Sequence, residues 1–284
     1  MQVVELGVYP IKSCRGLTVT TAAIAPTGFV GDREFVITDA QGQFLSQRQL
    51  PQLAQIQVTQ AGEQLTLVYA PGGLEPLTWT PTDQGPLRPV QVWRDRTLAR
   101  DQGEAVAQWL QRALALEAPV RLLRQSPQHR RPLDPDYATA ANQPVSFADA
   151  FPFLITTTAS LADLNRRLQA AYPGQDVTVP MNRFRPNIVI ASEQPFAEDA
   201  WQTVQIGRVC FDTVKPCARC IVTTTDQRSG DRSPLGEPLH TLAQFRRVPK
   251  AGILFGVNAI ARDLGTIQVG DPVQVLQGLP EGQP

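Results

Sequence analysis

The sequence predicts an α+β protein that is mainly β, and three observations favour this fold class. Short alternating or β-branched apolar runs recur at close intervals, which is typical of strands. The 284 residues include 25 prolines and 20 glycines, which suits many turns better than a helical bundle. Few segments repeat with the helical period of 3.6 residues, so we expect only a few peripheral helices.

The N-terminal part predicts a β-rich unit of the barrel or sandwich type, because its short strands are separated by turn-forming glycines, prolines and aspartates. The segments 55–59 and 64–69 are expected to form a hairpin. Strands are expected at residues 2–8, 18–24, 34–38, 44–46, 55–59, 64–69 and 90–93. A helix is expected over 102–117, with one buried face made by Val106, Trp109, Leu110, Ala113 and Leu114.

The C-terminal part mixes strands with two helices and follows a proline-rich loop at 125–144. One helix is expected to start at a capping box made by Ser160 and Asp163 and to end before Pro173. The second is expected at 239–246. Strands are expected at residues 153–157, 204–206, 209–211, 253–257, 266–269 and 273–276.

Composition excludes some classes of function. The 26 basic and 26 acidic residues cancel, unlike the strongly basic balance typical of nucleic-acid-binding proteins. The length suits one large or two moderate domains. We find neither a signal peptide nor an apolar run long enough for a membrane span, and four cysteines make no disulfide framework. We therefore expect a cytoplasmic protein with reduced thiols, without nucleic acid among its partners.

Two segments are candidates for binding an anion. The first follows strand 2–8 and contains Lys12 and Ser13, whose ammonium and hydroxyl groups can donate to a phosphate or carboxylate. An ordinary polar turn is the alternative. In the second, Arg183 and Arg185 alternate with Phe184, so in an extended chain both guanidinium groups would share one face. A solvated edge strand is the alternative there.

Within the stretch 216–226, two cysteines, an arginine and an aspartate lie close together in the sequence. Its first residue, a proline, is expected to end the preceding element, and the β-branched run 221–225 to form a strand that starts just after Cys220. Arg219 should favour the thiolate form of this neighbouring cysteine. Residue types alone leave two interpretations, a reactive or metal-binding thiolate and a buried structural pair with Cys217.

Other sequence patterns disfavour two kinds of metal or redox centre at these cysteines. A zinc site is disfavoured because there is no second Cys-x-x-Cys motif, and the only histidines are His129 and His240. A thioredoxin-like motif is disfavoured because the cysteine pair precedes a β-branched run instead of opening a helix. A soft metal or sulfur centre with one protein thiolate fits, with the basic residues holding a phosphorylated cofactor.

Several short motifs together resemble the MOSC-domain proteins, and the resemblance covers nearly the whole chain. It is strongest to the subgroup with a MOSC N-terminal β-barrel domain, which includes the mitochondrial amidoxime reducing component and bacterial reductases of the YcbX type. The motifs are Tyr9-Pro10-Ile11-Lys12-Ser13, Gly31-Asp32-Arg33, Phe147-Ala148-Asp149, Ser160-Leu161-Ala162-Asp163-Leu164-Asn165, Phe184-Arg185-Pro186-Asn187, Cys217-Ala218-Arg219-Cys220, Leu254-Phe255-Gly256 and Val269-Gly270-Asp271.

The resemblance implies a MOSC N-terminal β-barrel-like domain at residues 1–122 and a MOSC β-barrel domain at residues 123–284. It also implies a molybdenum cofactor, in which a phosphorylated pterin holds the metal through its dithiolene. The family's protein ligand is the second cysteine of its Cys-x-x-Cys motif, which is Cys220 here. The other cofactor-binding residues that the resemblance implies are Lys12, Ser13, Arg33, Arg183, Arg185 and Asn187.

The activity implied is reduction of small N-hydroxylated compounds, amidoximes and hydroxylamines, to amidines and amines. The candidate catalytic residues are Cys220 and Asp226. Asp226 is a candidate proton carrier, and it is equally suited to a structural role in a cap or turn. Electrons are expected from a separate ferredoxin-like protein or from a flavoprotein and b-type cytochrome chain, because no further cysteine cluster follows. A monomer is expected. The alternatives are a non-catalytic carrier of the cofactor or its sulfur, and a β-rich binding protein with structural cysteines.

Overall fold

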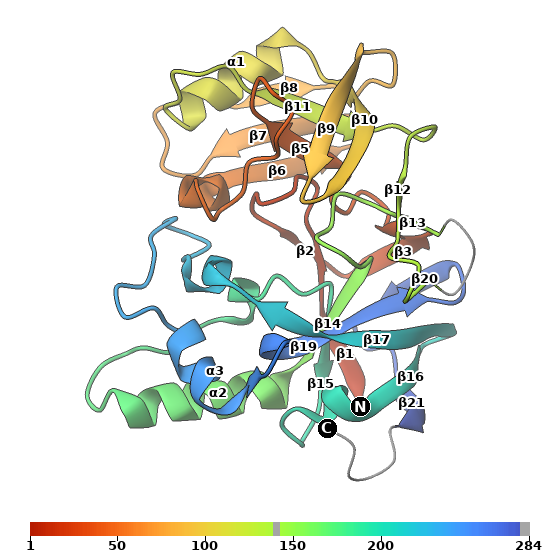
Figure 1. Cartoon of the computed structure of the whole chain (residues 1–284), viewed down its shortest axis with the longest axis vertical. Coiled ribbons are helices and arrows are strands. Elements are labelled where there is room, and N and C mark those ends of the chain that lie inside the picture. Colours follow the sequence, from red (N-terminus) through yellow and green to blue (C-terminus); the bar gives the residue numbers. More distant parts are fainter. Residues whose placement is uncertain (139–142, 279–284) are drawn as a thin grey trace.

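The computed structural model describes residues 1–138 and 143–278, which are dominated by strands (Figure 1). The predicted α+β, mainly β class is confirmed. The α-helices of the described ranges are α1 (Glu104–Ala113), α2 (Thr158–Ala171) and α3 (Leu239–Phe245). In Figure 1, α1 lies at one end of the molecule and α2 and α3 lie at the other.

A nine-stranded sheet forms the end that carries α2 and α3. Its strands are β1 (Gln2–Val8), β2 (Leu17–Val19), β14 (Phe153–Thr157), β15 (Ile188–Ala191), β16 (Trp201–Ile206), β17 (Val209–Arg219), β18 (Arg247–Val248), β19 (Gly252–Ala261) and β21 (Val273–Gly278). They follow the order β2-β1-β15-β14-β19-β17-β16-β21, and β18 pairs with β19. The first strand of the chain is therefore built into a sheet made mostly by the C-terminal half.

The alternation of β15 shows how this sheet buries both faces. Ile188 and Ile190 belong to the core cluster on one side, whereas Val189 joins the cluster on the other side with Leu164 of α2 and Leu242 of α3. All of these side chains are almost completely buried. Burial of each such side chain contributes about 1.5–3 kcal/mol, which is what holds the two helices on the sheet.

The opposite end contains two smaller sheets and α1. The sheet order is β5-β11-β10-β9 in one and β6-β7-β8 in the other. All five apolar residues predicted to form one face of the helix are buried. The strands are β5 (Phe35–Thr38), β6 (Ile56–Ala61), β7 (Gln64–Tyr69), β8 (Leu77–Trp79), β9 (Leu87–Val92), β10 (Asp95–Asp101) and β11 (Arg121–Gln125).

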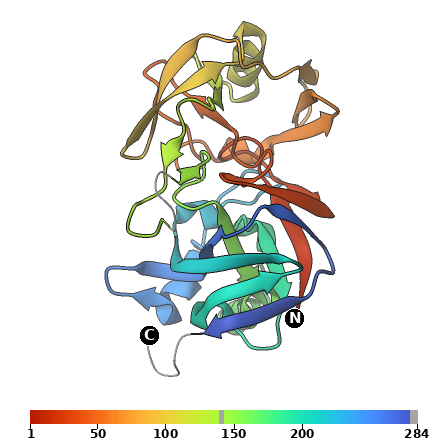
Figure 2. The ribbon, with the colours of Figure 1, turned by 90° about the vertical axis from the view of Figure 1, so that its right-hand side faces the viewer.

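Shorter elements complete the fold. They are β3 (Thr21–Ala25), β4 (Gly28–Phe29), β12 (Arg131–Pro132), β13 (Pro144–Val145), β20 (Gly265–Gln268) and the 3₁₀ helices η1 (Pro51–Gln55), η2 (Met181–Arg183), η3 (Ala197–Ala200) and η4 (Ile221–Thr224). Figure 2 shows the two ends of the molecule after a quarter turn. Strand β3 pairs with β20, and β1 pairs with β15, so strands pair across the division predicted at residue 122. The division itself stays a prediction.

Several predicted strands are confirmed, and others differ. Strand 2–8 and the hairpin of β6 and β7 are present, and the predicted strands 204–206 and 209–211 lie in β16 and β17, which pair with each other. The expected strand 18–24 is two strands, β2 and β3, in different sheets. Strands β8, β10 and β11 were not predicted. The charged sequence of β10 hides its strand character, because that strand is stabilised by pairing with β9 and β11 and not by local apolar alternation.

The predicted local structure around the cysteines is wrong in two respects. Strand β17 continues through Pro216, which lies at a register shift where the missing amide hydrogen is tolerated. The run 221–225 forms no strand, because its residues make the 3₁₀ helix η4. The hydroxyls of Thr223 and Thr224 donate to the carbonyls three residues earlier, at 2.9 and 2.7 Å, and so compete with a sheet ladder. Cys220 therefore follows a strand and does not precede one.

The predicted cap of α2 is also wrong. Thr157 is the N-cap, and its hydroxyl accepts the amide hydrogen of Ser160 at 3.3 Å. The extended backbone at the end of β14 gives Thr157 the geometry that an N-cap requires. The hydroxyl of Ser160 instead donates to the buried carboxylate of Glu198. Asp163 pairs with arginines one turn further along the helix.

The extended chain predicted around Phe184 is replaced by a tight turn. Arg183 ends η2, and Arg185 has a left-handed backbone with φ of 55°. This turn buries Phe184, whose ring stacks on Phe255 with centroids 3.9 Å apart. The two arginines consequently do not share a face as alternating strand residues would, and each has its own set of partners.

Candidate functional site

A pocket of about 300 Å³ is lined by residues from both halves of the chain. The positively charged residues of its described lining are Lys12, Arg33, Arg48, Arg185, Lys215 and Arg219. Asp149 is the single acidic residue among the lining residues that the structure describes. Six cations against one carboxylate make the pocket suited to an anionic ligand.

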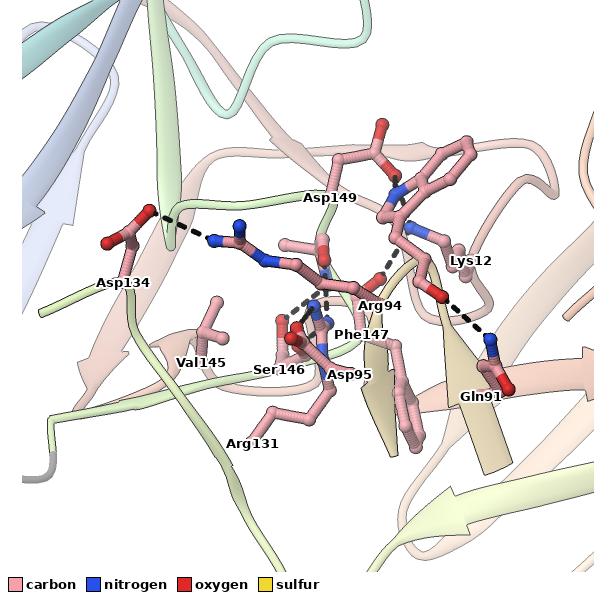
Figure 3. A network of polar contacts seen from close by, with 12 residues as sticks. Lys12, Gln91, Arg94, Asp95, Arg131, Asp134, Val145, Ser146, Phe147 and Asp149 are labelled. Atoms are coloured by element: carbon pink, nitrogen blue, oxygen red, sulfur yellow. Dashed lines mark hydrogen bonds and ion pairs between the residues drawn. The ribbon is translucent and has the colours of Figure 1, made fainter. Parts of the chain in front are cut away.

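The turn after β1 brings Lys12 and Ser13 into this lining. The Lys12 ammonium is buried, donates to the carbonyl of Phe147 at 2.8 Å and pairs with Asp149 (Figure 3). Burial lowers the pKa of Lys12, and the Asp149 carboxylate opposes this effect. Ser13 has a left-handed backbone, with φ of 69°. Within the described residues its hydroxyl makes no hydrogen bond, so it is available to a ligand.

Arg33 and Arg185 lie together on one side of the pocket. Their guanidinium carbons are 4.2 and 4.4 Å from the centroid of the Tyr9 ring. Arg33 also donates to the side-chain oxygen of Asn187 at 2.8 Å and pairs with the buried Asp32. Burial, together with the neighbouring charge of Arg33, lowers the pKa of Arg185 to about 10. Asn187 is itself fixed by bonds to the backbone of β1 and β14.

Cys220 and Cys217 both line the pocket, but their surroundings differ. The Arg219 guanidinium donates to the sulfur of Cys217 at 2.9 Å and to the carbonyl of Phe184 at 2.6 Å. The hydrogen bonds of the Arg219 guanidinium thus go to Cys217 and Phe184, and its expected effect on the Cys220 thiolate stays a prediction. The Cys220 sulfur makes no hydrogen bond to the residues that the structure describes.

Arg183 and Asp226 are not among the described lining residues of the pocket. Arg183 donates to the carbonyl of Thr224 at 2.8 Å and pairs with Asp226 at 3.1 Å. The other oxygen of Asp226 accepts the amide hydrogens of Arg228 and Ser229 at 2.7 and 3.1 Å. These contacts match the structural turn that the sequence left open for Asp226. Its role as proton carrier stays a prediction.

Several lining residues were not singled out from the sequence. Trp93 donates to Asp149 at 3.3 Å, packs on Phe44 and carries the Arg48 guanidinium 4.3 Å above its ring. Asp149 stood in one of the family-like motifs, which was the one available signal. Trp93 and Arg48 precede it by many residues in segments without a motif. They form a partly exposed rim of the pocket together with Lys215.

A buried arginine, Arg131, supports residues 146–148, and the carbonyl of Phe147 in this segment accepts a hydrogen bond from Lys12 (Figure 3). Arg131 is 2% exposed and donates to the carbonyls of Ser146 and Ala148, both at 2.9 Å. It also pairs with Asp95 at 2.7 Å. The carbonyl of Phe147, which lies between the two acceptors, is thus aimed at the Lys12 ammonium. These supporting contacts fix the geometry of the basic wall.

The part of the chain that the structure describes contains no cluster of three or more histidine, cysteine or acidic side chains arranged to hold a metal ion. No helix in the described ranges is long and apolar enough to cross a membrane.

Two family models match the chain, that of the MOSC N-terminal beta barrel domain at residues 1–117 and that of the MOSC domain at residues 142–274. Human mitochondrial amidoxime-reducing component 1 is 37% identical to the chain over 290 residues, which cover 96% of the chain and 82% of the human protein. The chain belongs to the MOSC family. The resemblance that the motifs indicated is thereby confirmed.

Two further MOSC relatives differ in their named roles. Mitochondrial amidoxime reducing component 2 of Bos taurus is 34% identical and covers 95% of the chain and 81% of its own length. A molybdenum cofactor sulfurase of Drosophila grimshawi is 32% identical over 97% of the chain, which corresponds to 35% of the sulfurase.

The MOSC motifs noted in the sequence converge in space. The pocket lining draws on the motifs that contain Lys12, Arg33, Asp149, Arg185 and Cys220, which are far apart along the chain. Donors for an anion and a cysteine thiol are thus combined in one place.

Proposed function

We propose that this MOSC protein is a molybdenum-cofactor-dependent oxidoreductase that reduces amidoximes and hydroxylamines to amidines and amines. The observation that carries the proposal concerns Cys220, whose thiol has no hydrogen-bond partner within the described residues and lines the same pocket as six cationic side chains. The names of the amidoxime-reducing relatives, at 37% and 34% identity over most of the chain, support the reaction class.

The residues present fit a phosphorylated pterin cofactor. Its phosphate is an anion, and Lys12, Arg33 and Arg185 offer the charge-assisted donors that such a group requires. The hydroxyl of Ser13 and the buried Nε–H of Arg219, which has no partner among the described residues, are further donors. We assign Asn187 to holding Arg33 in place and Cys220 to the metal.

When bound, the cofactor would supply a two-electron redox centre for removing the oxygen of an N–OH group. The chain's own residues bind and orient. Lys12 is fixed by a buried hydrogen bond and Arg185 by its contact with the Tyr9 ring, so the anionic end of the cofactor would meet donors that need little rearrangement. Trp93 and Arg48 at the rim would contact the substrate side of the pocket.

Electrons for the reaction are proposed to come from a separate protein, either a ferredoxin-like protein or a flavoprotein and b-type cytochrome chain. The described residues contain no second redox-type cysteine cluster. A cytoplasmic location and a monomeric state remain predictions from the sequence.

A carrier that hands over the cofactor or its sulfur without turning over a substrate is the second candidate. The match of nearly the whole chain to 35% of a molybdenum cofactor sulfurase favours it. Both candidates use the same pocket and differ only in the step after binding, so an assay of turnover separates them.

The test uses chain purified from a host that makes the molybdenum cofactor. Molybdenum and pterin per chain are measured for the wild type, Cys220→Ala and the matched control Cys217→Ala. We expect near-stoichiometric metal in the wild type and the control, and loss of molybdenum in Cys220→Ala. Turnover of an aromatic amidoxime with a chemical reductant then supports the reductase, whereas metal without turnover supports the carrier. Wild-type chain without molybdenum and pterin would refute both.

A further inference from the structure

Two buried glutamines form a reciprocal amide pair beside the pocket. Gln47 Nε2 donates to Gln227 Oε1 at 3.0 Å, and Gln227 Nε2 donates to Gln47 Oε1 at 3.0 Å. Gln47 is completely buried and Gln227 is 4% exposed. The residues are 180 positions apart, so the pair joins the N-terminal half to the loop that follows η4. Neither glutamine is among the described lining residues.

Every amide hydrogen of the pair has an acceptor. The second hydrogen of Gln47 Nε2 goes to the carbonyl of Ser13 at 2.7 Å, and that of Gln227 Nε2 goes to the carbonyl of Thr225 at 3.1 Å. Gln227 Oε1 also accepts from Arg185 Nη1 at 3.3 Å. A buried network in which all donors are used is rigid, and breaking one member leaves its partners unsatisfied.

Two hydrogen bonds of the pair reach residues that line the pocket, namely the bond to the carbonyl of Ser13 and the bond from Arg185. Ser13 and Arg185 both line the pocket, and both have a left-handed backbone, with φ of 69° and 55°. Non-glycine residues adopt this conformation only when their surroundings hold them there. The glutamine pair contacts the backbone of Ser13 and the guanidinium of Arg185, so it links two walls of the pocket.

The loop that carries Gln227 is itself docked on the N-terminal half. Arg15 donates to the carbonyl of Arg228 at 2.9 Å, and Arg232 donates to that of Gln47 at 3.0 Å. These contacts bring the segment downstream of Cys220 to the segment that carries Ser13. The amide pair is the buried centre of this docking.

We propose that Gln47 and Gln227 are positioning residues that hold Ser13 and Arg185 in the geometry required to bind an anionic phosphoryl group. The inference rests on the proposed function only in the identity of that group as the phosphate of the cofactor. The pair is distinguished from an ordinary buried amide by its contacts with two residues of the pocket lining. Gln102 shows that simpler case, because its buried amide bonds only the backbone of Thr82 and Arg100, away from the pocket.

The experiment compares Gln47→Met, Gln227→Met, the double variant and the matched control Gln102→Met. Full-length chain from a host that cannot make the cofactor is titrated with inorganic phosphate by calorimetry, below the melting temperature of each variant. Gln47→Asn and Gln227→Asn, which keep an amide but shorten its reach, serve as milder variants if a methionine variant does not fold. Unfolding in urea gives the stability of each protein.

We expect at least tenfold weaker phosphate binding for each single variant of the pair and a change of less than twofold for Gln102→Met. The double variant should regain part of the stability, because no buried amide is then left without its partner, but it should not regain phosphate binding. Phosphate affinity that follows stability alone, equally in Gln102→Met, would overturn the proposal. So would a wild-type chain that binds no phosphate.

A second measurement separates this inference from the proposed function. The same variants are made in the cofactor-producing host, and pterin per chain is measured after gel filtration. Wild-type chain that binds phosphate but carries no pterin would refute the proposed function and leave the positioning role intact. Reduced pterin in the pair variants, with the control at the wild-type value, would extend the role to the cofactor.

Discussion

Arg33 and Arg185 lie against the ring of the same tyrosine, with guanidinium carbons 4.2 and 4.4 Å from the Tyr9 centroid. Two partly buried cations that lie against one ring repel each other. Burial, and then this repulsion, lower the pKa of Arg185 to about 10. The electron-rich ring compensates part of the repulsion, and an anion bound between the arginines would remove more of it.

Replacing Tyr9 therefore tests the arginine pair. Tyr9→Leu removes the ring, and we expect phosphate affinity to fall about fivefold to thirtyfold, because a partly desolvated cation–π contact contributes about 1–2 kcal/mol. Tyr9→Phe keeps the ring and loses only the bond to the carbonyl of Pro186 at 3.1 Å. Its affinity should stay within about twofold of the wild type. Calorimetric titration checks both, and equal losses in the two variants would contradict the ring's role.

Lys12 should matter more for binding than for stability. Its ammonium is buried, which is costly, and its ionic partner Asp149 is largely exposed. We expect Lys12→Met to change the free energy of unfolding by less than about 1 kcal/mol and to weaken phosphate binding at least tenfold. Urea denaturation and calorimetry measure the two effects separately. Parallel losses of stability and binding would show that Lys12 is mainly structural.

Arg131 should have the opposite profile, with its main effect on stability. Arg131→Met leaves Asp95 and the carbonyls of Ser146 and Ala148 without their donor, and we expect a loss of about 2–4 kcal/mol in the free energy of unfolding. Arg130→Met is the matched control, because Arg130 is exposed and makes no hydrogen bond within the described residues. Its stability should change by less than about 0.5 kcal/mol. Similar destabilisation in both variants would be evidence against the buried network.

Asp226 makes a pH-dependent contribution to stability. Burial opposes its ionisation, but the amide hydrogens of Arg228 and Ser229 and the charge of Arg183 outweigh burial and keep its pKa below the usual 3.8. The unfolded chain therefore binds a proton more readily than the folded chain. The stabilisation is complete above pH 3.8 and is lost as the pH falls through the lower folded pKa.

We expect Asp226→Asn to cost about 1 kcal/mol or less at pH 7, because its carboxylate is about one-third exposed and solvent screens its pairing with Arg183. The difference from the wild type should shrink below pH 3.8. Urea titrations at several pH values provide the check. If the protein turns over an amidoxime, a large fall in kcat for Asp226→Asn at unchanged stability would support Asp226 as a proton carrier. A fall in stability alone would support a purely structural role in the turn.

Much of the fold was predictable because strands and helices leave local patterns. The buried face of α1, the strand β14 and strand segments within β16 and β17 were all visible as apolar periodicity. The wrong prediction for 221–225 shows the limit of such patterns. Thr223 and Thr224 are β-branched and favour strands, but their hydroxyls donate to carbonyls three residues earlier. These local hydrogen bonds favour the 3₁₀ helix η4 over a strand.

The site was predictable only in part. Lys12, Ser13, Arg33, Arg185, Asn187 and Cys220, all singled out in the sequence, are lining residues of one pocket. Arg183 and Asp226 pair with each other and are not in the described lining. Trp93 and Arg48 were missed, because an aromatic residue and a cation on a surface turn carry no signal until the fold brings them to a pocket.

The sequence by itself determined the family, the mainly β class and the motifs that carry donors and a thiol, because all of these depend on residue types and their spacing. The tertiary structure alone decided which side chains meet. Lys12 and Asp149 are 137 residues apart, and Gln47 and Gln227 are 180 apart. Local periodicity carries no information about such contacts, since they arise only when the two halves pack together and most buried donors pair with an acceptor.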